Sequence, residues 1–432
     1  MREACKWDYE LRFPEQVFNV IDRAHGIANS LPKGPVYVSL PREVLCERVD
    51  DAPGARRPQM APSRAAPHPA DVAKAAELLA NAAHPVIFAQ RGAGDAAGFS
   101  ALGELAQEWG IPVCQYWAVQ LAIATDHPMA AGSNPKPLLA EADVILVIDS
   151  LAPWSPGEAE PMESATVIQL GPDPLHSRFA VRNFRVDFGL SGEVAPSILA
   201  LKTAMDPLLP ARKARNEKRS KAVAQANSAN FAGRMTEAKS KRSAPQLTKA
   251  FISHALAEKT AGTGAAIFNE LGLQFPYMRL TEANSWFDGP HSGGLGWGFP
   301  AALGYKMAAS ERPVIAAMGD GSYIFANPVA CHQIAEANGL SIIVIVMNNA
   351  EWAAVRHSVK SLYPDGYAQA SNEVPLTSLA PSPNFVRVAE ASRAWAKRVA
   401  TADAFEAALA EALAHTGAGK GLALIEVTIA RE

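Results

Sequence analysis

The chain has 432 residues, of which 49% are hydrophobic, and its formal net charge at pH 7 is −3. This length predicts two or three domains, and the apolar fraction is sufficient for buried cores. The near-neutral charge provides no global basic field of the kind that binds nucleic acid.

The sequence contains no recognisable signal peptide, membrane span or cysteine motif. The four cysteines lie far apart, without a CxxC pair, and indicate neither a disulfide framework nor a metal site. The first 20 residues lack the apolar core of a signal peptide, and no apolar run is long enough to span a membrane. We therefore expect a cytoplasmic protein with no membrane partner.

In chain order, residues 1–45 predict one short helix (15–29) and one apolar strand (35–40). A linker rich in Pro, Ala and Arg follows at 46–69. Residues 70–203 alternate helix and strand, which is typical of a parallel, doubly wound α/β domain resembling a Rossmann fold. In that domain we expect helices at 70–82 and 97–109, and strands at 85–89, 111–114, 143–149 and 165–170.

Glycines follow the first of these strands. Gly92, Gly94 and Ala97 loosely match the GxGxxG pattern of dinucleotide-binding loops. Such glycines alone are weak evidence, so a flavin- or nicotinamide-dependent oxidoreductase remains only an alternative.

Residues 204–245 form a basic linker. Ten lysines and arginines stand against two glutamates between Arg212 and Arg242. A nucleic-acid-binding arm is one interpretation. Because aromatic residues for base stacking are nearly absent, we favour a solvated linker helix and no nucleic-acid partner.

Residues 246–432 contain the most informative pattern, Gly319-Asp-Gly-Ser322, followed about 25 residues later by Asn348-Asn349. An apolar strand at 314–318 precedes Asp320, a helical segment covers 322–338, and a second apolar strand at 340–347 precedes Asn349. In such a βαβ unit the two strands are parallel, so Asp320 and Asn349 should emerge at the same sheet edge.

The donor types indicate what that edge would bind. Carboxylate and amide oxygens are ligands that Mg²⁺ accepts while it also contacts phosphate oxygens. Residues 350–357 predict a new helix, whose free N–H groups would face an anion. We therefore predict a magnesium–diphosphate site.

These motifs resemble those of thiamine diphosphate (ThDP) enzymes of the acetolactate synthase, benzoylformate decarboxylase and pyruvate decarboxylase family. The glycine-rich segment 291–304 and the closing strand 423–428 are also similar, and the resemblance covers nearly the whole chain. It implies that 70–203 is the middle domain and 246–432 the diphosphate-binding domain. Residues 1–45 resemble only the end of a pyrimidine-binding domain, so on the order of a hundred residues would be missing.

The resemblance also implies site residues. Asp320, the side chain of Asn349 and the backbone carbonyl of Glu351 would bind Mg²⁺. Leu295 would lie between the two cofactor rings, with Gly293 beside the pyrimidine, and His291 could face the substrate. The remaining expected cofactor contacts are Gly321, Ser322, the amides of Trp352, Ala353 and Ala354, and Asn269 and Glu270. A carboxylate near phosphate is unexpected, so for Glu270 an ordinary strand-end role is the alternative.

The implied function is decarboxylation of a 2-oxo acid, with or without carboligation, and a homodimer or homotetramer is expected for the full-length form. In the family, a glutamate of the pyrimidine domain activates ThDP. No glutamate in 1–45 has the matching context, so we expect no turnover by this chain alone. A non-catalytic ThDP-fold subunit is therefore an alternative. FAD is doubtful, because the segment 150–157 departs from the flavin-binding pattern.

Overall fold

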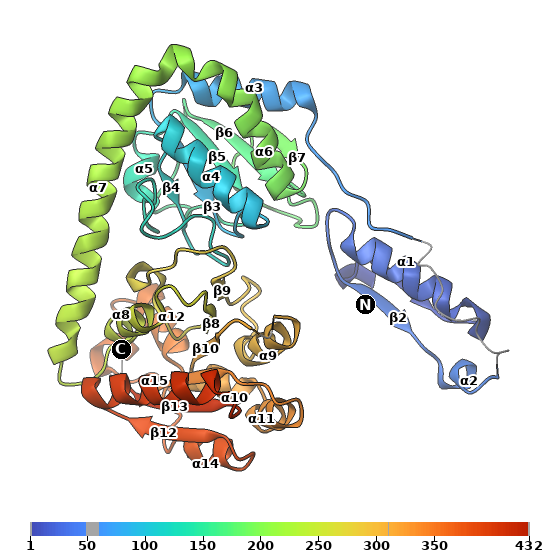
Figure 1. Ribbon diagram of the computed structural model, residues 1–432, viewed down its shortest axis with the longest axis vertical. Helices are drawn as coiled ribbons and strands as arrows, with labels where there is room; N and C mark the ends of the chain where they lie inside the picture. The colour runs from blue at the N-terminus through green and yellow to red at the C-terminus, as the bar shows by residue number, and fades with distance from the viewer. Residues whose placement is uncertain (1, 49–59, 310, 431–432) are drawn as a thin grey trace.

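The computed structural model describes residues 2–48, 60–309 and 311–430. We call residues 2–48 the N-terminal unit, 69–205 the middle unit and 247–430 the C-terminal unit. In Figure 1 the N-terminal unit projects from the side of the middle unit, and helix α7 (Lys213–Ser240) runs along the other two.

The N-terminal unit is a single βαβ unit. Strand β1 (Trp7–Glu10) pairs in parallel with β2 (Val36–Ser39), and α1 (Val17–Asn29) connects them. A short helix, α2 (Arg42–Leu45), follows. Our expectation of one strand here was wrong. The sequence Trp-Asp-Tyr-Glu alternates ring and acidic side chains, so it has no apolar run by which to recognise a strand.

The middle unit is a five-stranded parallel sheet in the order β4-β3-β5-β6-β7. The strands are β3 (Pro85–Ala89), β4 (Val113–Cys114), β5 (Val144–Ile148), β6 (Thr166–Gly171) and β7 (Phe188–Ser191). The helices are α3 (Pro69–Asn81), α4 (Ala96–Trp109), α5 (Lys136–Leu139) and α6 (Val194–Met205). Helices α3, α4 and α6 bury one sheet face, whereas Leu139 of α5 and Trp154 pack on the other.

The C-terminal unit has a six-stranded parallel sheet in the order β12-β13-β11-β10-β8-β9. Its strands are β8 (Ala266–Glu270), β9 (Trp286–Asp288), β10 (Val314–Gly319), β11 (Ile343–Asn348), β12 (Trp395–Val399) and β13 (Ala423–Thr428). Its helices are α8 (Lys249–Thr260), α9 (Gly298–Ala308), α10 (Asp320–Phe325), α11 (Pro328–Ala337), α12 (Ala353–Leu362), α13 (Tyr367–Ser371), α14 (Phe385–Glu390) and α15 (Ala402–Gly417).

Helices cover both faces of this sheet. Along β11, Ile343 and Ile345 pack with α8 and α15, whereas Val344 and Val346 pack with α9, α11 and α14. Strand side chains point alternately to opposite faces, so a strand buried on both sides has a continuous apolar sequence. The predicted fold class, α/β with doubly wound parallel sheets, is confirmed.

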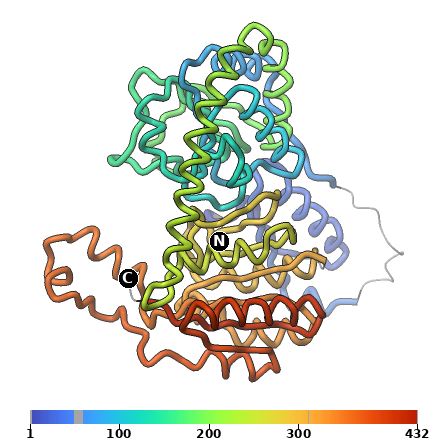
Figure 2. Tube along the Cα trace, turned by 60° about the vertical axis from the view of Figure 1, so that its left-hand side comes forward, coloured from blue at the N-terminus to red at the C-terminus, as the bar shows by residue number. Residues whose placement is uncertain are grey.

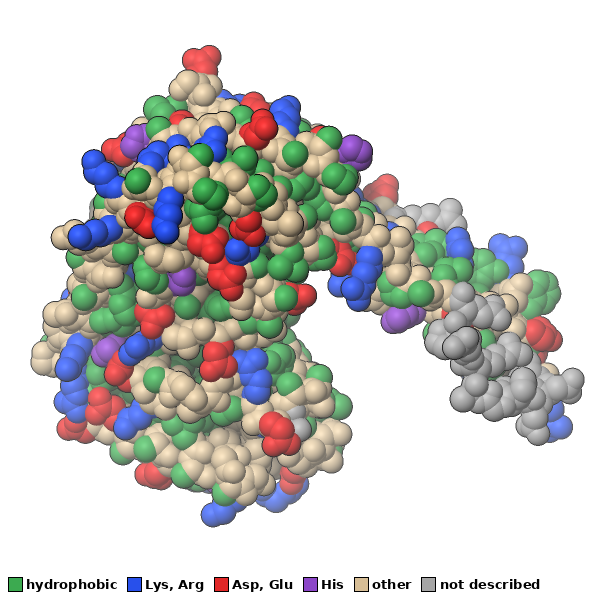
Figure 3. All heavy atoms as spheres, turned by 45° about the horizontal axis from the view of Figure 1, so that its top comes forward, with side chains coloured by type: hydrophobic (Ala, Val, Ile, Leu, Met, Phe, Trp, Pro, Cys, Tyr) green, Lys and Arg blue, Asp and Glu red, His purple; other side chains and the backbone are tan. Residues whose placement is uncertain are grey.

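Helix α7 fastens the middle unit to the C-terminal unit (Figure 2). The guanidinium of Arg219 donates to the carbonyls of Trp109 and Ala82, at 3.1 Å each, in the middle unit. Further along the helix, Arg234 donates to the carbonyl of Pro276 in the C-terminal unit at 3.2 Å. These arginines therefore bind backbone carbonyls of their own chain. On the face shown in Figure 3, acidic and basic side chains are intermixed and form no continuous basic surface.

A second connection lies between β4 and α5. There the carbonyl of Ala118 accepts from the indole N–H of Trp286 at 3.1 Å, and that of Val119 accepts from the amide of Asp288 at 2.8 Å. This segment of the middle unit therefore lies against the C-terminal sheet. None of the helices in the described part of the chain has the length and apolar sequence that a membrane crossing requires.

Candidate functional site

The ends of β10 and β11 lie side by side. These strands pair in parallel, with Gly319 opposite Met347, so the segments containing Asp320 and Asn349 leave the same sheet edge. The carboxylate Oδ2 of Asp320 accepts a hydrogen bond from the amide of Ala350 at 2.9 Å. The residue after Asn349 therefore binds Asp320 directly and holds the two halves of the predicted metal motif at one edge.

The helical segment after Asp320 differs from the expected continuous helix over 322–338. Helix α10 begins at Asp320 and ends at Phe325, and α11 begins at Pro328. Between them Asn327 has a left-handed backbone, with φ of 53°. Proline cannot donate an i→i−4 hydrogen bond, so it suits the first turn of a new helix rather than the interior of a long one.

Asp320 is a buried carboxylate, 2% exposed. Its Oδ1 accepts from the amide of Gly321 at 3.0 Å. Burial raises its pKa above the ordinary range, and backbone hydrogen bonds only partly oppose that shift. Within the described residues Asp320 forms no salt bridge, so a cation at this position would compensate its charge.

The two asparagines have different partners. The amide of Asn348 donates to Glu426 of β13 at 2.9 Å, which fixes it within the sheet. Asn349 is buried, and its Oδ1 accepts from the amide of Glu351 at 3.1 Å. Ala350, which lies between Asn349 and Glu351, has φ of 57°, so the chain turns sharply at this residue. The amide oxygen of Asn349 lies in this turn, whose Ala350 amide also binds Asp320.

The side chain of Glu351 points along α12, where it forms a 3.0 Å ion pair with Arg356. Both side chains are largely buried, and the second carboxylate oxygen of Glu351 has no partner among the described residues. The side chain of Glu351 is thus paired with Arg356. Only its backbone carbonyl was expected to bind Mg²⁺.

Helix α12 begins at Ala353, three residues later than expected. No side chain caps its N-terminus, so the amides of Ala353 and Ala354 in its first turn are not satisfied by a cap. The amide of Trp352, by contrast, donates to the carbonyl of Thr377 at 2.7 Å. The expected contact between the Trp352 amide and a diphosphate would require that bond to break.

The indole of Trp352 lies on Gly321. A Cβ atom at Gly321 would be 2.2 Å from Cζ3 of Trp352, so only glycine fits beneath the ring. The next residue, Ser322, is 2% exposed, and its hydroxyl has no hydrogen-bond partner among the described residues. A buried hydroxyl without a partner is costly, and a bound anion would satisfy it.

The glycine-rich segment meets the end of α10. Gly296 has φ of 89°, and a Cβ atom there would be 2.6 Å from the carbonyl carbon of Phe325. Gly293 also has a positive φ, 70°, and no atom lies within 4 Å of its Cβ position. Leu295, half-buried, lies between these two glycines. The structure therefore places the glycine-rich segment against the end of α10, the helix that begins with Asp320.

Asn269 and Glu270, at the end of β8, are both 3% exposed and bind loops of their own chain. Asn269 accepts from the amide of Leu273 at 2.6 Å and donates to the carboxylate of Asp288 at 3.2 Å. Glu270 accepts from the amides of two glycines of the glycine-rich segment. Both side chains thus have partners in their own chain, and for Glu270 the geometry favours the strand-end alternative.

His291 lies against an aromatic residue that our sequence analysis did not identify. Its ring centroid is 4.4 Å from that of Trp117, in the middle-unit segment that reaches the C-terminal sheet. Desolvation lowers the pKa of His291, and a backbone interaction with Trp117 partly opposes that shift. Trp117 has φ of 49°, which is unusual for a bulky residue. No sequence pattern links these two distant residues.

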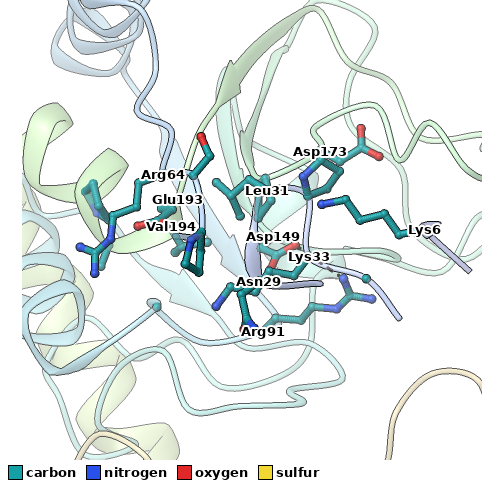
Figure 4. A pocket seen from close by; sticks show the side chains of 18 of the residues that line it. Lys6, Asn29, Leu31, Lys33, Arg64, Arg91, Asp149, Asp173, Glu193 and Val194 are labelled. Carbon is teal, nitrogen blue, oxygen red and sulfur yellow. Dashed lines mark ion pairs between the residues drawn. The ribbon is translucent and has the colours of Figure 1, made fainter. Parts of the chain in front are cut away.

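A cavity of about 1000 Å³ lies elsewhere, between the N-terminal and middle units (Figure 4). Lys6, Asn29, Arg91, Asp149 and Glu193 are among its lining residues, and none comes from the C-terminal unit.

The glycines beside this cavity have a packing explanation. A Cβ atom at Gly94 would be 2.7 Å from the backbone nitrogen of Ala195. The carboxylate of Asp95 accepts from the amide of Gly98 at 2.9 Å and so caps α4, where a dinucleotide would place its negative pyrophosphate. The oxidoreductase alternative therefore gains no support.

Two family models match the chain. Residues 72–201 match the thiamine pyrophosphate enzyme central domain, and residues 272–427 match the thiamine pyrophosphate enzyme C-terminal TPP binding domain. Together they cover most of the middle and C-terminal units. Both matches lie outside the N-terminal unit.

Curated relatives have similar sequences. Sulfoacetaldehyde acetyltransferase of Rhodobacter capsulatus is 27% identical, over 100% of this chain and 75% of its own length. A probable acetolactate synthase large subunit of Methanocaldococcus jannaschii is 25% identical, over 94% of this chain and 69% of its own length.

Among solved structures, benzoylformate decarboxylase from Polynucleobacter necessarius has the same fold. Its TM-score is 0.79 at 23% identity, over 99% of this chain and 76% of that one. The strand-edge geometry, the two family matches and this shared fold agree with one another. The chain belongs to the thiamine pyrophosphate enzyme family.

Proposed function

We propose that this protein binds ThDP and Mg²⁺ and acts on a 2-oxo acid, by decarboxylation with or without transfer of the remaining fragment to a second carbonyl compound. The main support is the hydrogen bond from the Ala350 amide to Asp320, because it brings two oxygen-donor segments together at one strand edge. The reaction is left this broad because similar proteins include a transferase, a synthase and a decarboxylase.

In this proposal the carboxylate of Asp320, the amide oxygen of Asn349 and the carbonyl of Glu351 hold Mg²⁺. Two observations support the fit. Asp320 is buried without a cationic partner in the described residues, and all three donors are oxygens, which Mg²⁺ prefers.

The diphosphate would lie against α10 and α12. The hydroxyl of Ser322 and the amides of Ala353 and Ala354 would donate to it, since the hydroxyl has no partner and the helix has no side-chain cap. The helix dipole adds a favourable field for negative charge. Gly321 would allow the indole of Trp352 to form the floor beneath this region.

When bound, ThDP supplies a nucleophilic carbon and an electron sink for decarboxylation. Leu295 would lie between the two rings of ThDP and fix their relative orientation. Gly293 would leave room for the pyrimidine ring. Desolvation lowers the pKa of His291 and so favours its neutral form, which would form a hydrogen bond with the substrate while the ring of Trp117 packs against it.

Calorimetric titration with ThDP, in the presence and absence of Mg²⁺, tests the cofactor assignment. We expect saturable binding that requires Mg²⁺. Release of CO₂ from a panel including pyruvate and benzoylformate then tests catalysis. No turnover by this chain alone is the expectation from the sequence, so binding without CO₂ release would not distinguish the enzyme from the non-catalytic subunit, whereas CO₂ release would show that the chain activates ThDP by itself. Absence of Mg²⁺-dependent ThDP binding would overturn the proposal.

We also propose that the protein self-associates as a dimer or tetramer. Phe325, Val329 and Val355, from α10, α11 and α12, are each more than half exposed. Large exposed apolar side chains near one another are typical of interaction surfaces. Sedimentation equilibrium should therefore give a mass of at least two chains, and a monomer at micromolar concentration would contradict this expectation.

A further inference from the structure

The environment of Glu270 is unusual for a buried carboxylate. It is 3% exposed and forms no salt bridge within the described residues. Instead Oε1 accepts from the amide of Gly296 and Oε2 accepts from the amide of Gly298, each at 2.6 Å. Gly298 is the first residue of α9, so the helix dipole also stabilises the negative charge. Both oxygens are therefore engaged by one short loop.

That loop is fixed from two directions. Gly296 contacts the carbonyl group of Phe325 on the opposite side, where a Cβ atom would be only 2.6 Å away. A Cβ atom at Gly298 would be 3.3 Å from both Cβ and Oε2 of Glu270. Leu295 immediately precedes this fixed region, so the position of its backbone depends on where Glu270 holds Gly296.

The preceding part of the loop lacks such restraint. Gly293 and Gly294 are exposed, and no atom lies within 4 Å of either Cβ position. Without the carboxylate of Glu270, the loop would keep the contact with Phe325 but lose two charge-assisted hydrogen bonds. These are the stronger kind of hydrogen bond.

We propose that Glu270 is a positioning residue, which sets the place of Leu295 beneath the cofactor rings and makes no contact with the diphosphate. This inference rests on the proposed function. A diphosphate contact is disfavoured because like charges repel, and because both oxygens of Glu270 already accept short hydrogen bonds. The metal would bind elsewhere on the same edge, at Asp320 and Asn349, with the diphosphate beside it.

Two ligands distinguish positioning from direct contact. Mg²⁺–ThDP contains both the rings and the diphosphate, whereas Mg²⁺–pyrophosphate contains only the latter. In Glu270→Gln the side chain keeps its shape, but its NH₂ group faces an amide N–H and one hydrogen bond is lost. We expect ThDP affinity to fall about 10-fold, while pyrophosphate affinity changes by less than about 2-fold.

Each outcome of the calorimetry has a distinct meaning. Equal losses for both ligands, or a change in pyrophosphate affinity alone, would overturn the positioning role. If wild-type protein bound neither ligand, the proposed function would fail instead. Glu270→Asp keeps the charge but is one methylene too short to reach both amides, so we expect an intermediate loss for ThDP.

Hydrogen exchange in the absence of any ligand gives an independent readout. In Glu270→Gln we expect faster exchange of the Gly296 and Gly298 amides, with β10 and β11 unchanged. Glu426→Gln is the matched control, because Glu426 is also buried, in the same sheet, but its partners are Asn348 and Arg398. Unchanged exchange of the loop in folded Glu270→Gln, or equal acceleration in the control, would overturn the inference.

Discussion

The carboxylate of Asp320 receives the amide proton of Ala350 at 2.9 Å, which joins the end of β10 to the turn after β11. These residues are far apart in sequence, and the parallel pairing of the two strands brings them together. The contact leaves the charge of Asp320 without a cation in the described part of the chain. The metal ligand that we propose and the residue that stabilises this turn are thus the same side chain.

Replacement of Asp320 by Asn should separate these two roles. The single amide oxygen of Asn can still accept from Ala350 while the hydrogen bond from Gly321 is lost, so the fold should be retained at somewhat lower stability, but the anionic donor is lost. We expect Mg²⁺-dependent ThDP affinity to fall by at least about 100-fold, measured by calorimetry. Asp365→Asn, an exposed residue after α12, should bind like wild type. Undiminished affinity in Asp320→Asn would refute the metal assignment.

Gly321→Ala should destabilise the protein by overpacking. The new methyl group would meet the indole of Trp352 at 2.2 Å, and we expect a cost of about 1–3 kcal/mol in denaturant unfolding. The cost should shrink when Trp352 is replaced by Leu, since the clash partner is then smaller. Gly304→Ala on α9 is the control, because its Cβ position is open and alanine favours helix. A neutral Gly321→Ala would contradict the packing described.

The parts of the fold that follow from periodicity could be predicted from sequence. Strands such as 314–318 and 343–347 are buried on both faces and therefore form uninterrupted apolar runs. Short edge strands lack that signal: β1 and β9 have only three or four residues and include acidic side chains. Their pairing is determined by tertiary contacts that no local pattern encodes.

The candidate site divides in the same way. Asp320 and Asn349 were recognised together because a βαβ unit dictates where its strand ends emerge. The partners of Glu270 and His291 were not recognised from the sequence. They come from loops whose course depends on positive-φ glycines and on packing between the units. A sequence identifies a carboxylate at a strand end, but its hydrogen-bond partners depend on the loop that returns to it.

Arg219 should contribute measurably to stability through α7. Its guanidinium binds carbonyls of the middle unit, so Arg219→Met leaves those carbonyls without a charged donor. We expect the free energy of unfolding to fall by about 2–3 kcal/mol in urea denaturation. Lys218→Met, an exposed neighbour on the same helix, should change it by less than about 0.5 kcal/mol. Equal effects of the two substitutions would show that the carbonyl contacts are unimportant.

Asp288 should make stability depend on pH. Burial raises its pKa to about 6, and hydrogen bonds from Gly289 and Asn269 oppose the shift while the charge of Glu270 adds to it. The folded state therefore binds the proton more tightly than the unfolded chain. The stabilisation is complete below the unfolded pKa, about 4, and is lost as pH rises through about 6.

Asp288→Asn isolates this effect from other titrating groups. The difference in unfolding free energy between wild type and variant should change by about 2 kcal/mol between pH 4 and pH 7, with wild type relatively more stable at the acidic end. Denaturant titrations at several pH values measure it. A difference that does not vary with pH would contradict the raised pKa of Asp288.

The two separate connections between the middle and C-terminal units have a mechanical consequence. Helix α7, whose 28 residues extend about 42 Å, joins the units along one side, and the Ala118–Val119 segment joins them at the sheet edge. A single connection would leave a hinge about which the units could swing, but two connections at different places oppose such rotation. Trp117 should therefore keep its place over His291 whether or not ligands are bound.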